Sequence, residues 1–280
     1  MLIGGISGLS AIFAVVLWGT NGGFEELARL WVLPVAFLGS FLVLGTLAFL
    51  FLWIMCILVD QNVPQEKDSP FYRRMLYLYA QAIMTIVQVR LHKKGFEQKM
   101  PEGRFLLVCN HLSDMDPVVL HWCFRKYQLA FISKRENSSM FIVGKMMHKT
   151  MCQMINREND REALRTILKC VQLLNDDEVS VAVFPEGYTS LDGRLQRFRG
   201  GVFKIAQKAH VPIVVCPLQG TEKVFHNAKR LKRTDVQLHI LGVIPPEELK
   251  GVTALGISER VYNMMLADLG EDYRPAEQNA

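Results

Sequence analysis

One histidine lies in a stretch of sequence where general-base chemistry is expected. Residues 110–117 read Asn-His-Leu-Ser-Asp-Met-Asp-Pro, so carboxylates follow His111 after three and five residues, at Asp114 and Asp116. An imidazole beside a carboxylate can accept a proton, because the carboxylate fixes its tautomer and stabilises the imidazolium. The spacing leaves Asp114 and Asp116 as alternative partners. Because such pairs are common, a turn rich in Asn, Ser and Asp is the plain alternative.

A second motif gives this histidine a context. Residues 184–187 read Phe-Pro-Glu-Gly and follow the apolar run 179–184, and His111 likewise follows the apolar run 105–109. Both runs are typical of short buried strands. The carboxyl ends of strands are where open α/β sheets bind ligands, so we expect both motifs to lie at such ends.

With both motifs in this order, the sequence resembles the glycerolipid acyltransferases of the lysophosphatidic acid acyltransferase (PlsC-like) family. His111 with Asp116 matches the H-x4-D motif of that family, and residues 184–187 match its F-P-E-G motif. The likeness covers roughly Gly95 to Gly220. It includes three further stretches, which are Lys134-Arg135-Glu136, Ile155-Asn156-Arg157 and Val211-Pro212-Ile213.

The resemblance implies a reaction and catalytic roles. The hydroxyl of an acceptor lipid would attack an acyl thioester directly, without an acyl-enzyme, and no G-x-S-x-G nucleophile elbow speaks against this. His111 would be the base and Asp116 its orienting partner. Glu186 is expected to help position the acceptor, and Gly187 to let the backbone approach closely.

Four cations are candidates for substrate binding. The resemblance implies that Arg157 binds glycerol phosphate, and a guanidinium suits this role because it can bond two oxygens at once. Lys134 would serve the phosphate or the oxyanion, while Arg194 and Arg199 flank the second motif. For each of them a plain surface cation is the alternative.

The second motif departs from the family pattern at two positions. Tyr188 and Thr189 stand where the family usually has Thr and then Arg or Asn. If that arginine normally binds the acceptor's phosphate, this chain would rely on Arg157 and Lys134, or would prefer a phosphate in diester linkage. The leading acceptor is 1-acyl-sn-glycerol 3-phosphate, which would give phosphatidic acid, and a lysophospholipid with another headgroup is the alternative.

Two other classes of function compete with acyl transfer. A lipid ester or thioester hydrolase would use His111 to activate water. A non-catalytic membrane module would keep the fold alone, and the intact His111, Asp116 and Glu186 argue against it. The acyl donor would be acyl-CoA or acyl-ACP as a co-substrate, and no other cofactor is expected.

Runs typical of strands and helices alternate after residue 105, which predicts an α/β domain with a mainly parallel sheet flanked by helices. The expected strands are residues 105–109, 129–133, 151–155, 179–184, 213–218 and 236–243. The expected helices are residues 140–147, 202–209, 254–269 and one following a cap at Asn159 or Asp160. An earlier amphipathic helix is expected over Phe71–His92, packed on the domain or lying at the membrane interface.

The apolar residues are concentrated at the amino terminus. Residues 31–59 contain no charge and are long enough to cross a bilayer, for which roughly 20 residues suffice. Residues 1–18 form a second apolar segment that either completes a hairpin or lies in the membrane. No Lys or Arg precedes it, which argues against a cleaved signal peptide. More Lys and Arg follow residue 59 than precede residue 31, which favours a catalytic part on the cytoplasmic side.

These patterns divide the chain into a membrane region (1–59), a linker with an interfacial helix (60–94), an acyltransferase domain (95–270) and a tail (271–280). Residues 1–59 hold one basic and two acidic residues, so the remaining chain carries +6 and the whole chain +5. A basic domain of this kind suits an anionic lipid surface or phosphorylated substrates. Its basic residues form no stripe interleaved with aromatics, which argues against nucleic acid. The six scattered cysteines are typical of reduced thiols, and no metal site is expected.

Overall fold

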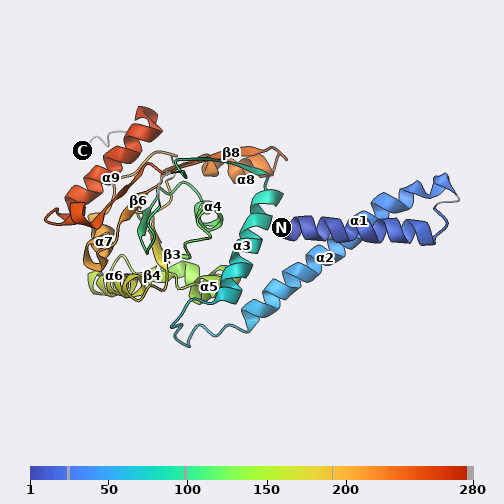
Figure 1. Ribbon diagram of the computed structural model, residues 1–280, viewed down its shortest axis with the longest axis horizontal. Helices are drawn as coiled ribbons and strands as arrows, with labels where there is room; N and C mark the ends of the chain where they lie inside the picture. Colours follow the sequence, from blue (N-terminus) through green and yellow to red (C-terminus); the bar gives the residue numbers. More distant parts are fainter. Residues whose placement is uncertain (24–25, 98–99, 191, 276–280) are drawn as a thin grey trace.

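The computed structural model describes residues 1–23, 26–97, 100–190 and 192–275. A helical hairpin at the amino terminus extends away from a domain in which helices surround two sheets (Figure 1). The hairpin consists of α1 (Leu2–Thr20), a short 3-10 helix (Leu27–Trp31) and α2 (Val32–Ile57). Both apolar segments that the sequence singles out are therefore helices. Residues 276–280 of the expected tail lie outside the described residues.

The larger sheet confirms the expected architecture. Its strand order is β4-β3-β5-β2-β6-β9, and the first five of these run parallel, while β9 is antiparallel to β6. The bounds are β2 (Leu106–Val108), β3 (Leu129–Lys134), β4 (Gln153–Ile155), β5 (Ser180–Val183), β6 (Ile213–Val215) and β9 (Gly242–Ile244). The carboxyl ends of β2 and β5, where the two motifs begin, are therefore neighbours.

The smaller sheet contains a strand that the sequence pattern does not predict. β1 (Val89–Lys94) pairs in parallel with β8 (Thr234–His239), which pairs antiparallel with β7 (Leu218–Gln219). The expectation of one helix over Phe71–His92 is wrong for its last residues. Helix α3 (Pro70–Ile86) ends before Gln88, whose φ is +54°. Pairing with a strand distant in sequence overrides the local helical pattern.

The remaining helices flank the larger sheet, except α8, which lies beside β8 of the smaller sheet (Figure 1). They are α4 (Asp116–Cys123), α5 (Phe141–Lys149), α6 (Asp160–Asn175), α7 (Lys204–Ala209), α8 (Val224–Ala228) and α9 (Ala254–Leu269). Asn159 caps α6 as expected, because its side-chain oxygen accepts hydrogen bonds from the backbone N–H groups of Arg161 and Glu162, both at 3.1 Å.

The core lies in two layers that β2 separates. Leu106 and Val108 belong to the buried cluster that includes residues of α6, α7 and α9, whereas Leu107 and Cys109 belong to the cluster that includes residues of α3 and α4. This alternation follows from the two-residue period of a strand. With both faces covered, β2 is fixed firmly, and so is the loop that follows it.

Helix α3 joins the hairpin to the domain. Met75 of α3, Leu52 and Cys56 of α2 and Met146 of α5 form one buried cluster. Trp53 of α2 extends this contact to α5, with its ring centroid 4.5 Å from that of Phe141.

A buried ion pair fixes the start of α3. Arg73 is 3% exposed and pairs with Asp68 at 2.6 Å. It also donates hydrogen bonds to the backbone carbonyls of Leu129, where β3 begins, and of Thr150. Because a buried charge is costly without partners, this network ties α3 to the larger sheet. Arg73 is one of the basic residues after residue 59 on which the expected cytoplasmic orientation rests, and its buried contacts give it a structural role.

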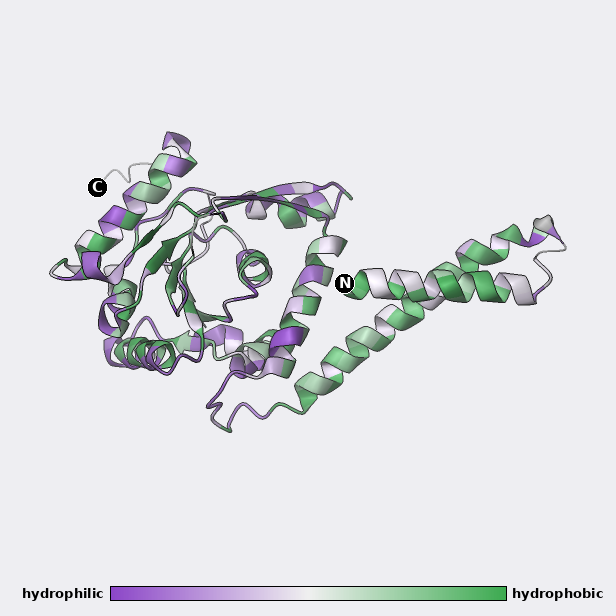
Figure 2. Ribbon diagram, viewed as in Figure 1, coloured by the Kyte–Doolittle hydropathy of each residue, from purple (hydrophilic) through white to green (hydrophobic). Residues whose placement is uncertain are grey.

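Beyond this contact the hairpin is apolar along its length (Figure 2). Residues 2–20 and 28–57 are both long and apolar enough to cross a membrane, and only 11% of each span is buried. Exposed apolar surface of this extent needs another apolar environment. The hairpin is therefore consistent with membrane association.

Candidate active site

The loop after β2 is held in place by one side chain. Asn110 is fully buried, donates through Nδ2 to the carbonyl of Leu218 at 2.9 Å and accepts from its N–H at 2.8 Å. This pair of bonds ties the end of β2 to the start of β7. The next residue, His111, therefore leaves the sheet at a fixed point.

His111 and Asp116 form the expected pair. Nδ1 of His111 lies 2.8 Å from Oδ2 of Asp116, at the first turn of α4. A hydrogen on Nδ1 donated to this carboxylate leaves Nε2 with a lone pair, which is the tautomer that a general base requires. Asp114, the alternative partner, is exposed and has no hydrogen bond to His111.

Asp116 accepts hydrogen bonds from other groups besides His111. Its Oδ2 also accepts from the backbone N–H groups of Leu112 at 2.6 Å and Ser113 at 2.8 Å. Its Oδ1 accepts from the hydroxyl of Thr221, and the side chain is fully buried. The carboxylate is thus oriented by four donors and desolvated, which suits a residue that positions the base and stabilises its charged form.

The second motif closes over the imidazole. The ring of Phe184 stacks on that of His111, with centroids 4.2 Å apart and an interplanar angle of 14°. Thr189 places its Oγ1 3.0 Å from Nε2, and the His111 side chain is 17% exposed. Because Nδ1 donates to Asp116, the Thr189 hydroxyl is the donor in this bond. A reacting hydroxyl must therefore displace that of Thr189 to reach Nε2.

Glu186 is buried and bonds two backbone N–H groups. Its Oε1 accepts from the N–H of His111 at 2.7 Å and its Oε2 from the N–H of Gln196 at 2.9 Å. The residue is 1% exposed, and burial raises the pKa of its carboxyl to about 8, although the two N–H donors act in the opposite direction. This geometry makes Glu186 a positioning residue that joins two loops.

Gly187 lies against Arg199. The φ of Gly187 is +85°, and a Cβ atom there would lie 2.9 Å from Nε of Arg199. Only glycine combines this backbone conformation with such a close approach. The backbone N–H of Arg199 donates to the carbonyl of Pro185 at 2.8 Å, which fixes the chain beside the motif.

Arg157 lies near Arg199. Burial lowers the pKa of Arg157, the positive charge of Arg199 lowers it further, and Glu136 acts in the opposite direction. Within the described parts of the chain, neither guanidinium forms an ion pair. Two cations that interact electrostatically, neither with a bound carboxylate, suit an anionic group with several oxygens.

The other two candidate cations are placed differently. Lys134 is exposed and ends β3, where it pairs in register with Ile155, two residues before Arg157. Arg194 helps to close its own loop instead, because its backbone N–H donates to Asp192 at 3.1 Å and its carbonyl accepts from Ser190 at 2.7 Å. Lys134 thus shares an edge of the sheet with Arg157, whereas among the described residues no hydrogen bond joins Arg194 to Arg157 or Arg199.

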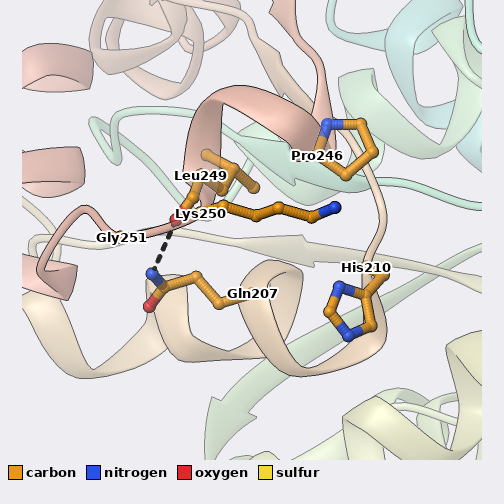
Figure 3. Close-up of a pocket in the computed structure, with 6 residues that line it drawn as sticks. All are labelled: Gln207, His210, Pro246, Leu249, Lys250 and Gly251. Carbon is orange, nitrogen blue, oxygen red and sulfur yellow. Dashed lines mark hydrogen bonds between the residues drawn. The ribbon is translucent and has the colours of Figure 1, made fainter.

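A surface pocket lies at the opposite end of the parallel strands from His111. Its lining residues are Gln207, His210, Pro246, Leu249, Lys250 and Gly251 (Figure 3). His210 precedes β6, whereas His111 follows the parallel neighbour β2, so the two lie at opposite ends of the strands. Gln207 fills one side by donating to the carbonyls of Leu249 and Val252, at 3.2 and 2.8 Å. This pocket is therefore separate from the histidine site.

Several groups at the site have no local sequence signal. Thr221 bonds Asp116, 105 positions away, and the backbone N–H of Gln196 bonds Glu186, ten positions away; only the fold reveals either contact. Phe184 lies within the Phe-Pro-Glu-Gly motif, so its place beside His111 could have been inferred. Among the described residues, no group of three or more His, Cys, Asp or Glu side chains is arranged to hold a metal ion.

Comparison with known proteins places this site in a family. The model of the family described as Acyltransferase matches residues 89–219, a range that contains both motifs and Arg157. Residues 89–219, just under half of the chain, are therefore similar to the acyltransferase family. The match begins at β1, which agrees with the pairing of β1 and β8 inside the domain.

Curated relatives extend the likeness. A probable 1-acyl-sn-glycerol-3-phosphate acyltransferase of Mycoplasma pneumoniae is 28% identical over 64% of this chain and 66% of its own length. A 1-acyl-sn-glycerol-3-phosphate acyltransferase of Chlamydomonas reinhardtii is 33% identical over 53% of this chain and 44% of its own length. The chain thus spans just under two thirds of the first relative and less than half of the second.

A solved structure supports the fold. The crystal structure of the 1-acyl-sn-glycerophosphate (LPA) acyltransferase PlsC from Thermotoga maritima superposes with a TM-score of 0.60 at 20% identity, over 81% of this chain and 89% of that one. At this identity the likeness concerns the fold, which is the mostly parallel sheet with flanking helices.

Proposed function

We propose that this chain is a membrane-bound O-acyltransferase. It transfers a fatty acyl group from an acyl thioester, acyl-CoA or acyl-ACP, to the free hydroxyl of a lysophospholipid. The leading acceptor is 1-acyl-sn-glycerol 3-phosphate, and the names of the curated relatives support this choice. The His111–Asp116 pair, with its buried carboxylate and its basic Nε2, is the observation that carries the proposal.

The proposed proton path uses one imidazole. Nε2 of His111 takes the proton of the acceptor hydroxyl as its oxygen attacks the thioester carbonyl. The tetrahedral intermediate then forms the ester as the carbon–sulfur bond breaks, and the imidazolium returns the proton to the departing thiolate. Asp116 stabilises the imidazolium throughout. General-base catalysis of this kind contributes about 10²–10⁴ in rate.

The arginine pair is the proposed phosphate handle. Arg157 and Arg199 together provide two guanidinium groups, each able to bond two oxygens. Lys134, at the same edge of the sheet, is available to the phosphate or to the oxyanion. Thr189 stands where the family usually has Arg or Asn, so this pair would supply most of the positive charge.

The apolar hairpin is the proposed membrane anchor. Residues 2–20 and 28–57 would enter the bilayer and hold the domain beside its lipid substrate. The excess of Lys and Arg after residue 59 supports a cytoplasmic catalytic domain.

The test uses the purified full-length chain in detergent or vesicles. Labelled acyl-CoA, and separately acyl-ACP, is supplied with a panel of lysophospholipids to the wild type and to His111→Ala. We expect label in one diacyl phospholipid, and its loss in the variant by at least about 10²-fold. Label found only as free fatty acid would replace this proposal with a hydrolase.

A further inference from the structure

A short basic loop joins α8 to β8. It comprises residues 229–233, which read Lys-Arg-Leu-Lys-Arg, and we call it the 229–233 loop. All five residues are exposed, and none of its four cations forms an ion pair with another described residue. The neighbouring carboxylate of Asp235 is already paired with His92 at 2.6 Å. The loop therefore presents four uncompensated positive charges.

An apolar side chain stands at the centre of these charges. Leu231 is 82% exposed, more than any other large hydrophobic residue of the domain that the structure describes. Its φ is +53°, a conformation that is unusual for leucine. The backbone keeps this form because the N–H groups of Leu231 and Lys232 donate to the carbonyls of Ala228 and Asn227, at 3.0 and 2.9 Å. The turn thus holds the leucine outward.

The loop lies beside the root of the hairpin. Thr234 pairs with Val89, and its N–H donates to the carbonyl of Gln88, just after the end of α3. The amino group of Met1, at the start of α1, donates to Oε1 of Gln81 in α3 at 2.7 Å. Gln81 lies about 7.5 Å before the end of that helix, at 1.5 Å per residue. In Figure 1 the loop after α8 reaches past the end of α3 on the side from which the hairpin extends.

Exposed apolar residues continue from the loop along α3. Ile86 and Ile83, in its last turn, are 68% and 41% exposed. Leucine and isoleucine surrounded by cations match the boundary between headgroups and acyl chains, where apolar groups enter and charged groups meet lipid phosphate.

We propose that the 229–233 loop docks on an anionic lipid surface. Leu231 and Ile86 enter the headgroup region, and the four cations bind lipid phosphates beside the hairpin. The inference rests on the proposed membrane location but not on acyl transfer. An acidic carrier protein also fits a basic patch, yet the continuity with α3 and the hairpin favours the bilayer.

The experiment measures amide hydrogen exchange of the full-length chain in two kinds of vesicle, phosphatidylcholine alone and a 7:3 mixture with phosphatidylglycerol. Each cation near an anionic surface adds about fivefold in binding, so four add several hundredfold. We expect the amides of residues 229–233 to exchange at least about fivefold more slowly in the mixed vesicles. The protection should disappear near 1 M salt, where the Debye length is about 3 Å.

Two variants make the test specific. Replacing Lys229, Arg230, Lys232 and Arg233 with Gln should abolish the protection. The matched control replaces four exposed cations on α6 and α7 with Gln and should retain it. These are Arg161, Arg165, Lys204 and Lys208. His111→Ala should also retain it, so failure of the catalytic proposal is seen separately.

Equal exchange in the two vesicles would overturn the proposal, as would equal loss of protection in the two quadruple variants. Protection that required acyl carrier protein and not phosphatidylglycerol would also overturn it in favour of a protein partner.

Discussion

The hydroxyl of Thr221 donates a hydrogen bond to Oδ1 of Asp116, across 105 positions of the chain. The opposite oxygen of the same carboxylate accepts from His111, Leu112 and Ser113. Thr221 therefore completes the orientation of the carboxylate that orients the base. It ties the loop after β7 to the first turn of α4, so the smaller sheet contributes to the histidine site.

Asp116→Asn should lower kcat strongly, because a neutral amide lacks the negative charge that stabilises the imidazolium of His111. We expect a fall of about 10²–10⁴-fold, similar to His111→Ala, with little change in KM. Thr221→Val should cause a smaller fall and lower the thermal stability, since one oxygen of a buried carboxylate loses its donor. Steady-state kinetics and thermal unfolding in detergent measure these effects. Full activity in Asp116→Asn would remove Asp116 from the mechanism.

Thr189→Val should keep activity within about tenfold of the wild type. The Thr189 hydroxyl bonds Nε2 only until an acceptor hydroxyl replaces it, and valine has the same shape without that bond. Kinetics with acyl-CoA and 1-acyl-sn-glycerol 3-phosphate provide the measurement, with His111→Ala alongside. A loss as large as in His111→Ala, together with labelled acyl group trapped on the wild-type chain, would instead make Thr189 a nucleophile.

Arg157→Ala should raise KM for a phosphate-bearing acceptor and leave KM for the acyl donor unchanged. Loss of a hydrogen bond to a charged group costs about 1.5–3 kcal/mol, which corresponds to roughly 10–150-fold. Arg199→Ala should act in the same direction, and the double variant should show non-additive effects because the two side chains bind one group. Arg161→Ala, an exposed arginine on α6, serves as the control. A rise in KM for the donor would assign the pair to the carrier.

Glu186 should make the folded chain less stable as pH rises. Its pKa is raised from 4.5 to about 8 in the fold, so between these values the folded state binds more protons than the unfolded state. The free energy of unfolding therefore falls through this window, by about 1 kcal/mol per pH unit. Thermal unfolding of detergent-solubilised protein at pH 5 to 8 tests this.

Glu186→Gln is the control for that pH dependence. It should remove this contribution, but it should also be less stable at pH 5, because the amide nitrogen cannot accept from a backbone N–H. Identical pH slopes in the wild type and in Glu186→Gln would assign the dependence to other groups.

The sequence predicts much of the fold because most elements carry local signals. The first five apolar runs after residue 105 correspond to the parallel strands of the larger sheet, and Asn159 begins α6 as its side-chain chemistry indicates. The single strand expected over residues 236–243 is wrong, because this stretch is divided between β8 and β9, which belong to different sheets. β1 carries no comparable signal. It is half-exposed and contains Arg90, His92 and two lysines, so only its pairing with β8 identifies it.

The same limit applies to the site. His111 and Asp116 are found because both lie in one short motif, and their hydrogen bond supports the predicted pairing. The proximity of Arg157 to Arg199 depends on two loops meeting at an edge of the sheet, and no pattern of spacing encodes that distance. Glu186 is recognised from its motif, yet its burial against backbone is visible only in three dimensions.

The place of β1 has a consequence for how this chain can be divided. A shortened chain beginning after Lys94 would leave β8 with an open edge and would lose Arg73 from the carbonyls of Leu129 and Thr150. A water-soluble fragment would have to begin at or before Asp68, the partner of that arginine. The segment that follows the hairpin is therefore also part of the folded catalytic domain. A truncation that removes the hairpin must end within residues 58–67.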